Sequence, residues 1–144
     1  MEQNRKKQIL ELLNSAGNQT LNKDLEIIFT DVSEEHLSAT MPVTPKVHQP
    51  LGILHGGASC VLAETLGSCL SLVSLDISKE VPVGTNLNTN HLRTKREGIV
   101  TGTATFIRKG NSVHVSQIEI RDENGELINF TTMTNNIVPL SKIN

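Results

Sequence analysis

The segment from His55 to Leu75, HGGASCVLAETLGSCLSLVSL, constrains the fold more than any other part of the sequence. From Gly57 onwards it has no proline and few β-branched residues, so we expect a helix that ends near Leu75. Leucine and valine side chains cover most of its circumference, as in a helix buried in a protein core. One charged residue, Glu64, interrupts the apolar surface. An unpaired carboxylate buried there would cost several kcal/mol, so its presence requires an explanation.

An amphipathic N-terminal helix is expected before this segment. Its Ile9, Leu12 and Leu13 have helical spacing, and Gly17 with Asn18 provides an end signal.

Strands are predicted in most of the rest of the chain. Two runs with strand composition lie before the central helix, at 25–32 and 36–43. A loop rich in proline and glycine, 44–57, joins them to the helix. Four further strands are expected after it, at 81–92, 98–110, 112–122 and 126–138. Asn124–Gly125 marks the turn of the last hairpin. Short connections favour an antiparallel sheet, so we predict one α+β domain over residues 1–144, with the sheet wrapped around the central helix.

Composition excludes several classes of protein. The formal charge of −2 and the pI near 6.2 argue against nucleic-acid binding through bulk positive charge. No apolar stretch reaches the ~20 uncharged residues that cross a bilayer, and no signal-type core precedes the first helix, so a cytoplasmic location is expected. Cys60 and Cys69 would lie roughly 13 Å apart on one helix, beyond disulfide reach, and should be reduced. We expect no cofactor and no metal site.

The central helix carries a narrow polar stripe, formed by Glu64, Gly67, Ser68 and Ser71. One interpretation is structural, with Glu64 satisfied by Ser68 or by a neighbouring strand. The other is catalytic, because the HGG sequence at 55–57 begins the helix. Backbone N–H groups there lack partners within the helix and can polarise a thioester or ester carbonyl. A carbonyl polariser and a carboxylate are two parts of an acyl-transfer site.

These two parts are too far apart to meet on one chain. Gly56 and Glu64 are separated by eight residues, roughly 12 Å along a helix axis. We therefore expect a dimer in which Glu64 of one subunit faces Gly56 of the other.

Two segments of the chain resemble a known family. QPLGILHGGASCVLAETLGS (49–68) and NTNHLRTKREGIVTG (88–102) are similar to hotdog-fold acyl-CoA thioesterases. The nearest group contains the dihydroxynaphthoyl-CoA thioesterases of bacterial menaquinone synthesis and the hydroxybenzoyl-CoA thioesterases with a helix glutamate. The resemblance covers nearly the whole chain. It implies a hotdog fold, thioester hydrolysis, an acyl-CoA substrate and a homodimer or a homotetramer built as a dimer of dimers.

The resemblance also implies roles for individual residues. Glu64 would be the catalytic carboxylate, and Gly56 would donate its N–H to the thioester oxygen with His55 beside it. Gln49 would orient the carbonyl or the water, which Ser68 would help to hold. Each also has a structural alternative, with His55 capping the helix and Gln49 an ordinary loop residue.

Substrate-binding residues follow from the same resemblance. His91 matches a position near the acyl pocket, or is an ordinary strand residue. Two basic clusters could meet the phosphates of coenzyme A, or be merely solvated: Arg93, Lys95 and Arg96, and Arg108 with Lys109. The segment around Lys109 and Gly110, RKGNSVH, resembles the nucleotide-contacting turn of the family.

The predicted function is hydrolysis of an acyl-CoA thioester to an acid and coenzyme A, with dihydroxynaphthoyl-CoA as the first candidate. Phenylacetyl-CoA, medium-chain or broad-range substrates remain alternatives. Glu64 would act either as nucleophile or as general base on water. A hydroxyacyl thioester dehydratase would use a His and an acid together, but the chain lacks an HFP-like motif. A non-catalytic acyl-CoA sensor would need a DNA-binding segment larger than the N-terminal helix.

Overall fold

The computed structural model describes residues 1–143. Its larger elements are two long helices and six strands, in the order α1 (Gln3–Ala16), β1 (Ile28–Val32), β2 (His36–Pro42), α3 (Gly56–Val73), β3 (Glu80–His91), β4 (Ile99–Lys109), β5 (Val113–Arg121) and β6 (Leu127–Pro139). Three short helical turns complete it: α2 (Leu21–Asp24), η1 (Pro45–Val47) and η2 (Leu140–Lys142). The predicted order of helices and strands is confirmed.

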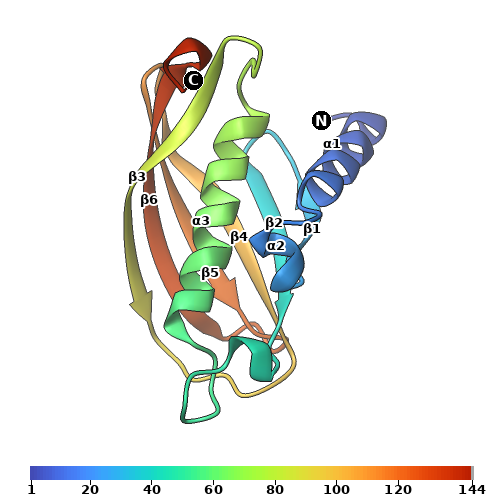
Figure 1. The fold of residues 1–144 in the computed structure, drawn as a ribbon, viewed down its shortest axis with the longest axis vertical. Helices are drawn as coiled ribbons and strands as arrows, with labels where there is room; N and C mark the ends of the chain where they lie inside the picture. The colour runs from blue at the N-terminus through green and yellow to red at the C-terminus, as the bar shows by residue number, and fades with distance from the viewer. Residues whose placement is uncertain (144) are drawn as a thin grey trace.

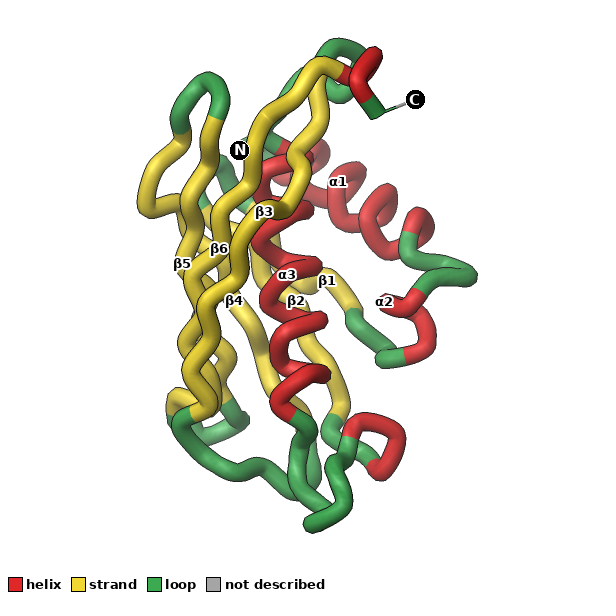
Figure 2. Tube along the Cα trace, turned by 60° about the vertical axis from the view of Figure 1, so that its left-hand side comes forward, coloured by secondary structure: helices red, strands yellow, loops and turns green. Residues whose placement is uncertain are grey.

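The six strands form one antiparallel sheet in the order β1-β2-β4-β5-β6-β3. Long α3 runs along one face of this sheet, and α1 lies on the same side, beyond the β1–β2 end (Figure 1). Figure 2 shows the curved sheet and α3 as adjacent layers. The predicted α+β architecture, with a sheet wrapped around a long central helix, is therefore confirmed.

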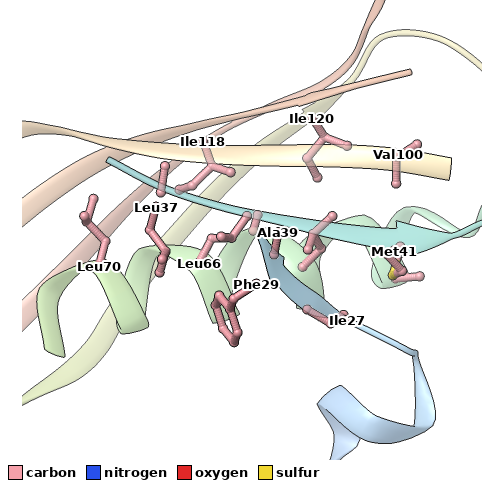
Figure 3. Close-up of a cluster of buried hydrophobic side chains, with 14 of the residues drawn as sticks. Ile27, Phe29, Leu37, Ala39, Met41, Leu66, Leu70, Val100, Ile118 and Ile120 are labelled. Atoms are coloured by element: carbon pink, nitrogen blue, oxygen red, sulfur yellow. The ribbon is translucent and has the colours of Figure 1, made fainter. Parts of the chain in front are cut away.

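The core lies between α3 and the sheet. Leu62, Leu66 and Leu70 are at most 1% exposed, and they pack against alternate residues of the strands. Figure 3 shows this layer, with side chains of β2, β4 and β5 facing α3. Gly67 allows the close approach, since a β-carbon there would stand 2.7 Å from the sulfur of Met133 on β6. The apolar circumference predicted for the helix is thus used mainly against the sheet.

The N-terminal helix packs through two of the three predicted residues, Ile9 and Leu13, and not through Leu12. Leu13 is buried, and Ile9 and Leu10 are partly buried against the core, whereas Leu12 is 62% exposed. The expected end of the helix at Gly17 is confirmed, since Gly17 caps it with a hydrogen bond to the Leu13 carbonyl. Asn14 fastens α1 to β1 by exchanging two hydrogen bonds with the backbone of Phe29.

Strand β3 is one edge of the sheet and pairs only with β6. Its central residues from Val83 to Asn86 are all exposed in the single chain. Such an edge presents unpaired backbone N–H and C=O groups, which proteins generally cover or pair.

Within residues 1–143, α3 is the one helix long and apolar enough to cross a membrane by length and composition. Its packing against the sheet explains that composition as that of a core helix. Cys60 and Cys69 on α3 are both free thiols, as predicted. Burial raises the pKa of Cys69 to about 11.

Candidate active site

A cavity of about 310 Å³ lies at the N-terminus of α3. Four residues expected to act in catalysis or substrate binding line it: Gln49, Gly56, His91 and Arg93. They come from three parts of the sequence, namely the loop before α3, the first turn of α3 and the end of β3. The structure therefore places these four together, although more than 40 residues separate the first from the last.

His55 is the N-cap of α3. Its Nδ1 accepts a hydrogen bond of 2.7 Å from the N–H of Gly57, and its carbonyl accepts from the N–H groups of Ala58 and Ser59. This is the capping alternative for His55, and the cap occupies Nδ1 of the ring. Among the described residues, no hydrogen-bond acceptor is found for the N–H of Gly56. This N–H lies at the positive end of the helix dipole, and Gly56 lines the cavity.

His91 lies directly against Gly56. A β-carbon on Gly56 would stand 2.6 Å from Nε2 and 2.8 Å from Cε1 of the His91 ring. Only a glycine leaves room for the ring there, because real β-carbons essentially never come that close to another heavy atom. The second residue of the HGG sequence therefore has a structural requirement of its own, which is close contact with the end of β3.

Gln49 is held in the turn that precedes α3. Its Oε1 accepts a hydrogen bond from the N–H of Leu51, and its backbone N–H donates to the Ile53 carbonyl over 2.9 Å. The ends of the turn are fastened as well, since the N–H of His55 donates to Val47 and that of Leu54 to Lys95. The amide oxygen of Gln49 is thus used within the loop, while its NH₂ group has no acceptor among the described residues.

Glu64 differs from its expected setting. The single chain leaves its side chain exposed, so the predicted burial of a carboxylate is wrong for the isolated chain. Its Oε1 is 3.4 Å from the point where a β-carbon on Gly84 of β3 would stand. Glu64 therefore lies over the exposed edge strand, and no hydrogen-bond or ion-pair partner for its side chain is found within residues 1–143.

The polar stripe on α3 is divided by this packing. Ser68 is half-buried, one turn after Glu64, whereas Ser71 is fully buried. Asn135 of β6 donates to the Ser71 hydroxyl over 3.1 Å and to the Gly67 carbonyl over 3.2 Å. The stripe thus begins at the surface and ends in the core, so its four residues do not line one site as the sequence suggested.

Glu64 and Ser68 do not line the cavity that contains Gly56. The eight-residue separation along α3 corresponds to roughly 12 Å of helix rise. A single chain therefore presents the carboxylate and the free N–H at two separate places on the same helix.

The expected phosphate-binding residues also lie at two places. Lys109 and Gly110 line a second cavity of about 390 Å³, together with Glu80 and His114. Burial lowers the pKa of His114, and Lys109 lowers it further by charge repulsion. Arg93 lies at the first cavity. One chain does not bring Arg93 and Lys109 into the same cavity.

Acidic residues neutralise part of the basic cluster after β3. Arg93 pairs with Glu126 over 3.1 Å, and Lys95 pairs with Glu123 over 2.5 Å. Lys95 and the Ile99 N–H together hold the pKa of Glu123 at about 2. The acidic partners lie about 30 residues further along the chain, in the β5–β6 turn. Local sequence patterns could therefore not predict these ion pairs.

A serine, a histidine and an aspartate also meet in the β1–β2 hairpin, away from both cavities. The ring of His36 lies 2.7 Å from the Ser33 hydroxyl and 2.9 Å from Asp31. The same hydroxyl accepts hydrogen bonds from the N–H groups of Glu35 and His36, both at 3.1 Å. Ser33 is therefore a turn residue that organises the hairpin, and this group is not the active site.

Known proteins resemble the chain over most of its length. Residues 51–129 match the protein family described as "Thioesterase superfamily". A protein of Vibrio cholerae is 51% identical over 87% of this chain and 83% of its own length. The 1,4-dihydroxy-2-naphthoyl-CoA hydrolase of Escherichia coli is 40% identical over 93% of this chain and 98% of its own.

A solved structure agrees with this similarity. The crystal structure of a mutant of thioesterase PA1618 from Pseudomonas aeruginosa superposes with a TM-score of 0.89 at 41% identity. The alignment covers 91% of this chain and 94% of the other.

Proposed function

The chain belongs to the thioesterase superfamily and is a hotdog-fold thioester hydrolase, and we propose that it hydrolyses an aromatic acyl-CoA, with 1,4-dihydroxy-2-naphthoyl-CoA as the first candidate. The observation that carries the proposal is the pairing of a free N–H on Gly56 with the imidazole of His91 in one cavity. The hydrolase of Escherichia coli, with 40% identity over nearly its whole length, supports the choice of acyl group.

In the proposed mechanism the thioester oxygen accepts a hydrogen bond from the Gly56 N–H. This donor stabilises the negative charge that develops on the oxygen, and one such donor is typically worth about 3–4 kcal/mol. Glu64 supplies the second function, either by attacking the carbonyl or by removing a proton from the attacking water. Attack would give a mixed anhydride with release of the coenzyme A thiolate, and water would then open the anhydride. Both routes end in a free acid and coenzyme A.

We propose that the working site forms between two subunits. Glu64 lies beside the exposed edge strand β3, and pairing that edge with a second copy would cover its free backbone groups. The same pairing would bring Glu64 of one chain towards Gly56 of the other. Ser68, half-buried on the turn after Glu64, would then help to hold the water, and a dimer of dimers would give a homotetramer.

Substrate recognition is assigned to residues near Gly56. His91 can donate a hydrogen bond to an oxygen of the acyl group, and Arg93 at the same cavity can meet the pantetheine or phosphate part of coenzyme A once it leaves Glu126. Lys109 and Gly110 are proposed for the nucleotide, at the second cavity. Such a substrate would make the protein an enzyme of menaquinone synthesis. The two free thiols fit the reducing cytoplasm.

The experiment is a panel of kcat/KM values for hydroxynaphthoyl-, benzoyl-, phenylacetyl- and straight-chain acyl-CoAs. We expect hydroxynaphthoyl-CoA to be favoured, because a site built to bond a hydroxyl discriminates against substrates without one. A kcat/KM at least tenfold higher for straight-chain substrates, a difference of about 1.4 kcal/mol, would overturn the aromatic assignment. Release of free coenzyme A, followed with a thiol reagent, separates hydrolysis from dehydration or simple binding.

A further inference from the structure

A buried polar network lies behind His91, between the ends of β3 and β6. Asn129 and Thr131 of β6 are 0% exposed, and they pair across the strands with His91 and Thr89 of β3. A buried polar side chain is costly unless its donors and acceptors are satisfied, so this group of side chains has to form a consistent set of bonds.

The hydrogen bonds of this network centre on the side-chain amide of Asn129. Its Oδ1 accepts the Thr131 hydroxyl over 2.7 Å, and its Nδ2 donates to Thr89 Oγ1 over 2.7 Å. The two threonine hydroxyls are 2.8 Å apart, so Thr89 can donate to Thr131 in turn. The second N–H of the amide points at Nδ1 of His91, at 3.1 Å. In this arrangement the NH₂ group of the amide faces the imidazole, and the Thr131 hydroxyl faces the amide oxygen.

This orientation selects one tautomer of the ring. An amide NH₂ can only donate, so Nδ1 of His91 has to be the acceptor. The proton of the neutral imidazole is therefore on Nε2. That nitrogen is the atom closest to Gly56, 2.6 Å from the position of a β-carbon there. The network thus places an Nε2–H next to Gly56, the residue whose backbone N–H is free.

We propose that Asn129 is a positioning residue, which holds His91 as the Nε2–H tautomer so that the ring is a second donor beside the Gly56 N–H. The inference rests on the proposed function, and it makes the oxyanion site a pair of donors rather than one. Two donors aimed at the same oxygen stabilise the charge that develops in the transition state. The opposite tautomer would turn a lone pair towards that oxygen and repel it.

The first test needs no substitution. Nitrogen-15 NMR of the wild-type protein at alkaline pH distinguishes protonated from unprotonated ring nitrogens, and His91→Gln assigns the signals. We expect Nδ1 of His91 to be unprotonated and Nε2 to carry the proton. A proton on Nδ1 of the wild type would overturn the proposal. This readout requires no substrate, so it holds even if the proposed acyl group is wrong.

The second test inverts the hydrogen bond. Asn129→Asp has nearly the same shape, but its carboxylate only accepts, so it should move the proton of the neutral ring to Nδ1. We expect the inverted NMR pattern, a fall in kcat of about 10²-fold and a much smaller change in KM. Asn136→Asp is the control, since it adds the same charge to the same strand at an exposed position. It should keep kcat within about twofold, and the unchanged tautomer.

Two results of the second test would contradict the proposal. One is an unchanged tautomer in Asn129→Asp, and the other is an inverted tautomer with full activity. A wild type that hydrolyses none of the thioesters, yet shows the Nε2–H form, would refute the proposed function and leave the tautomer assignment standing.

Discussion

The His91 ring packs on the Cα of Gly56, so that Nε2 stands 2.6 Å from where a β-carbon would be. This contact joins the end of β3 to the start of α3 and places an imidazole at a helix N-terminus. The free N–H of Gly56 and the ring share one cavity of about 310 Å³. The geometry of that cavity therefore depends on the absence of a single methyl group.

Gly56→Ala should displace His91 and damage catalysis. The added β-carbon needs the space that the ring occupies, so the ring has to move by an ångström or more. Misplacement by 1 Å at a reacting centre can cost about 10²-fold, and we expect a fall in kcat of that order. Gly17→Ala is the matched control, because a β-carbon there meets its neighbours at ordinary distances of 3.5 Å or more. Steady-state kinetics check both, and full activity in Gly56→Ala would contradict the packing argument.

The shared site can be tested by mixing inactive subunits. Gly56→Pro removes the backbone N–H, and Glu64→Gln removes the carboxylate. In a heterodimer of the two, one site combines the intact Glu64 with the intact Gly56. Random mixing should then restore about a quarter of the wild-type sites, because half of the dimers are mixed and each has one good site. No activity in verified heterodimers would place both groups in one subunit.

The N-terminal helix should loosen in acid. Asp31 bonds to Lys6 of α1 and to His36, and these partners hold its pKa at about 2, below the ordinary 3.8. A lowered folded-state pKa contributes stability above pH 3.8, which is lost as the pH falls from about 4 to about 2. Because the carboxylate is 41% exposed, solvent screening limits the contribution to about 0.5–1 kcal/mol.

Asp31→Asn should remove this contribution. We expect a slightly lower Tm than the wild type at pH 7 and a difference that vanishes near pH 2, measured by circular dichroism. A difference in Tm that persists unchanged in acid would show that charge is not its cause.

Much of the fold could be predicted from local sequence patterns. Leucines at 62, 66 and 70 repeat with the period of a helix, and the alternation of Leu37, Ala39 and Met41 has the period of a strand. Both patterns reflect burial on one face, and the structure buries these residues. Gly125 adopts a φ of 81°, as the predicted Asn-Gly turn requires.

Only part of the candidate site could be predicted from the sequence. The free N–H at Gly56 follows from where the helix starts, but the role of His55 as a cap depends on a rotamer that sequence does not specify. The bond from Asn129 to His91 depends on the register of β3 against β6, which joins residues 38 positions apart. Exposure of Glu64 was missed, because an apolar helix composition does not tell which side faces the sheet and which faces a partner.

The most direct test of the central claim is the rate of acyl-CoA hydrolysis by Glu64→Gln. Glutamine keeps the size and hydrogen bonding of the side chain and removes its negative charge. The side chain is exposed in the chain, so the Tm should change little. We predict that kcat falls by about 10³-fold or more on hydroxynaphthoyl-CoA, while Glu11→Gln, an exposed acid on α1, keeps the wild-type rate. A Glu64→Gln protein that retains most of its activity would contradict the assignment of Glu64 as the catalytic carboxylate.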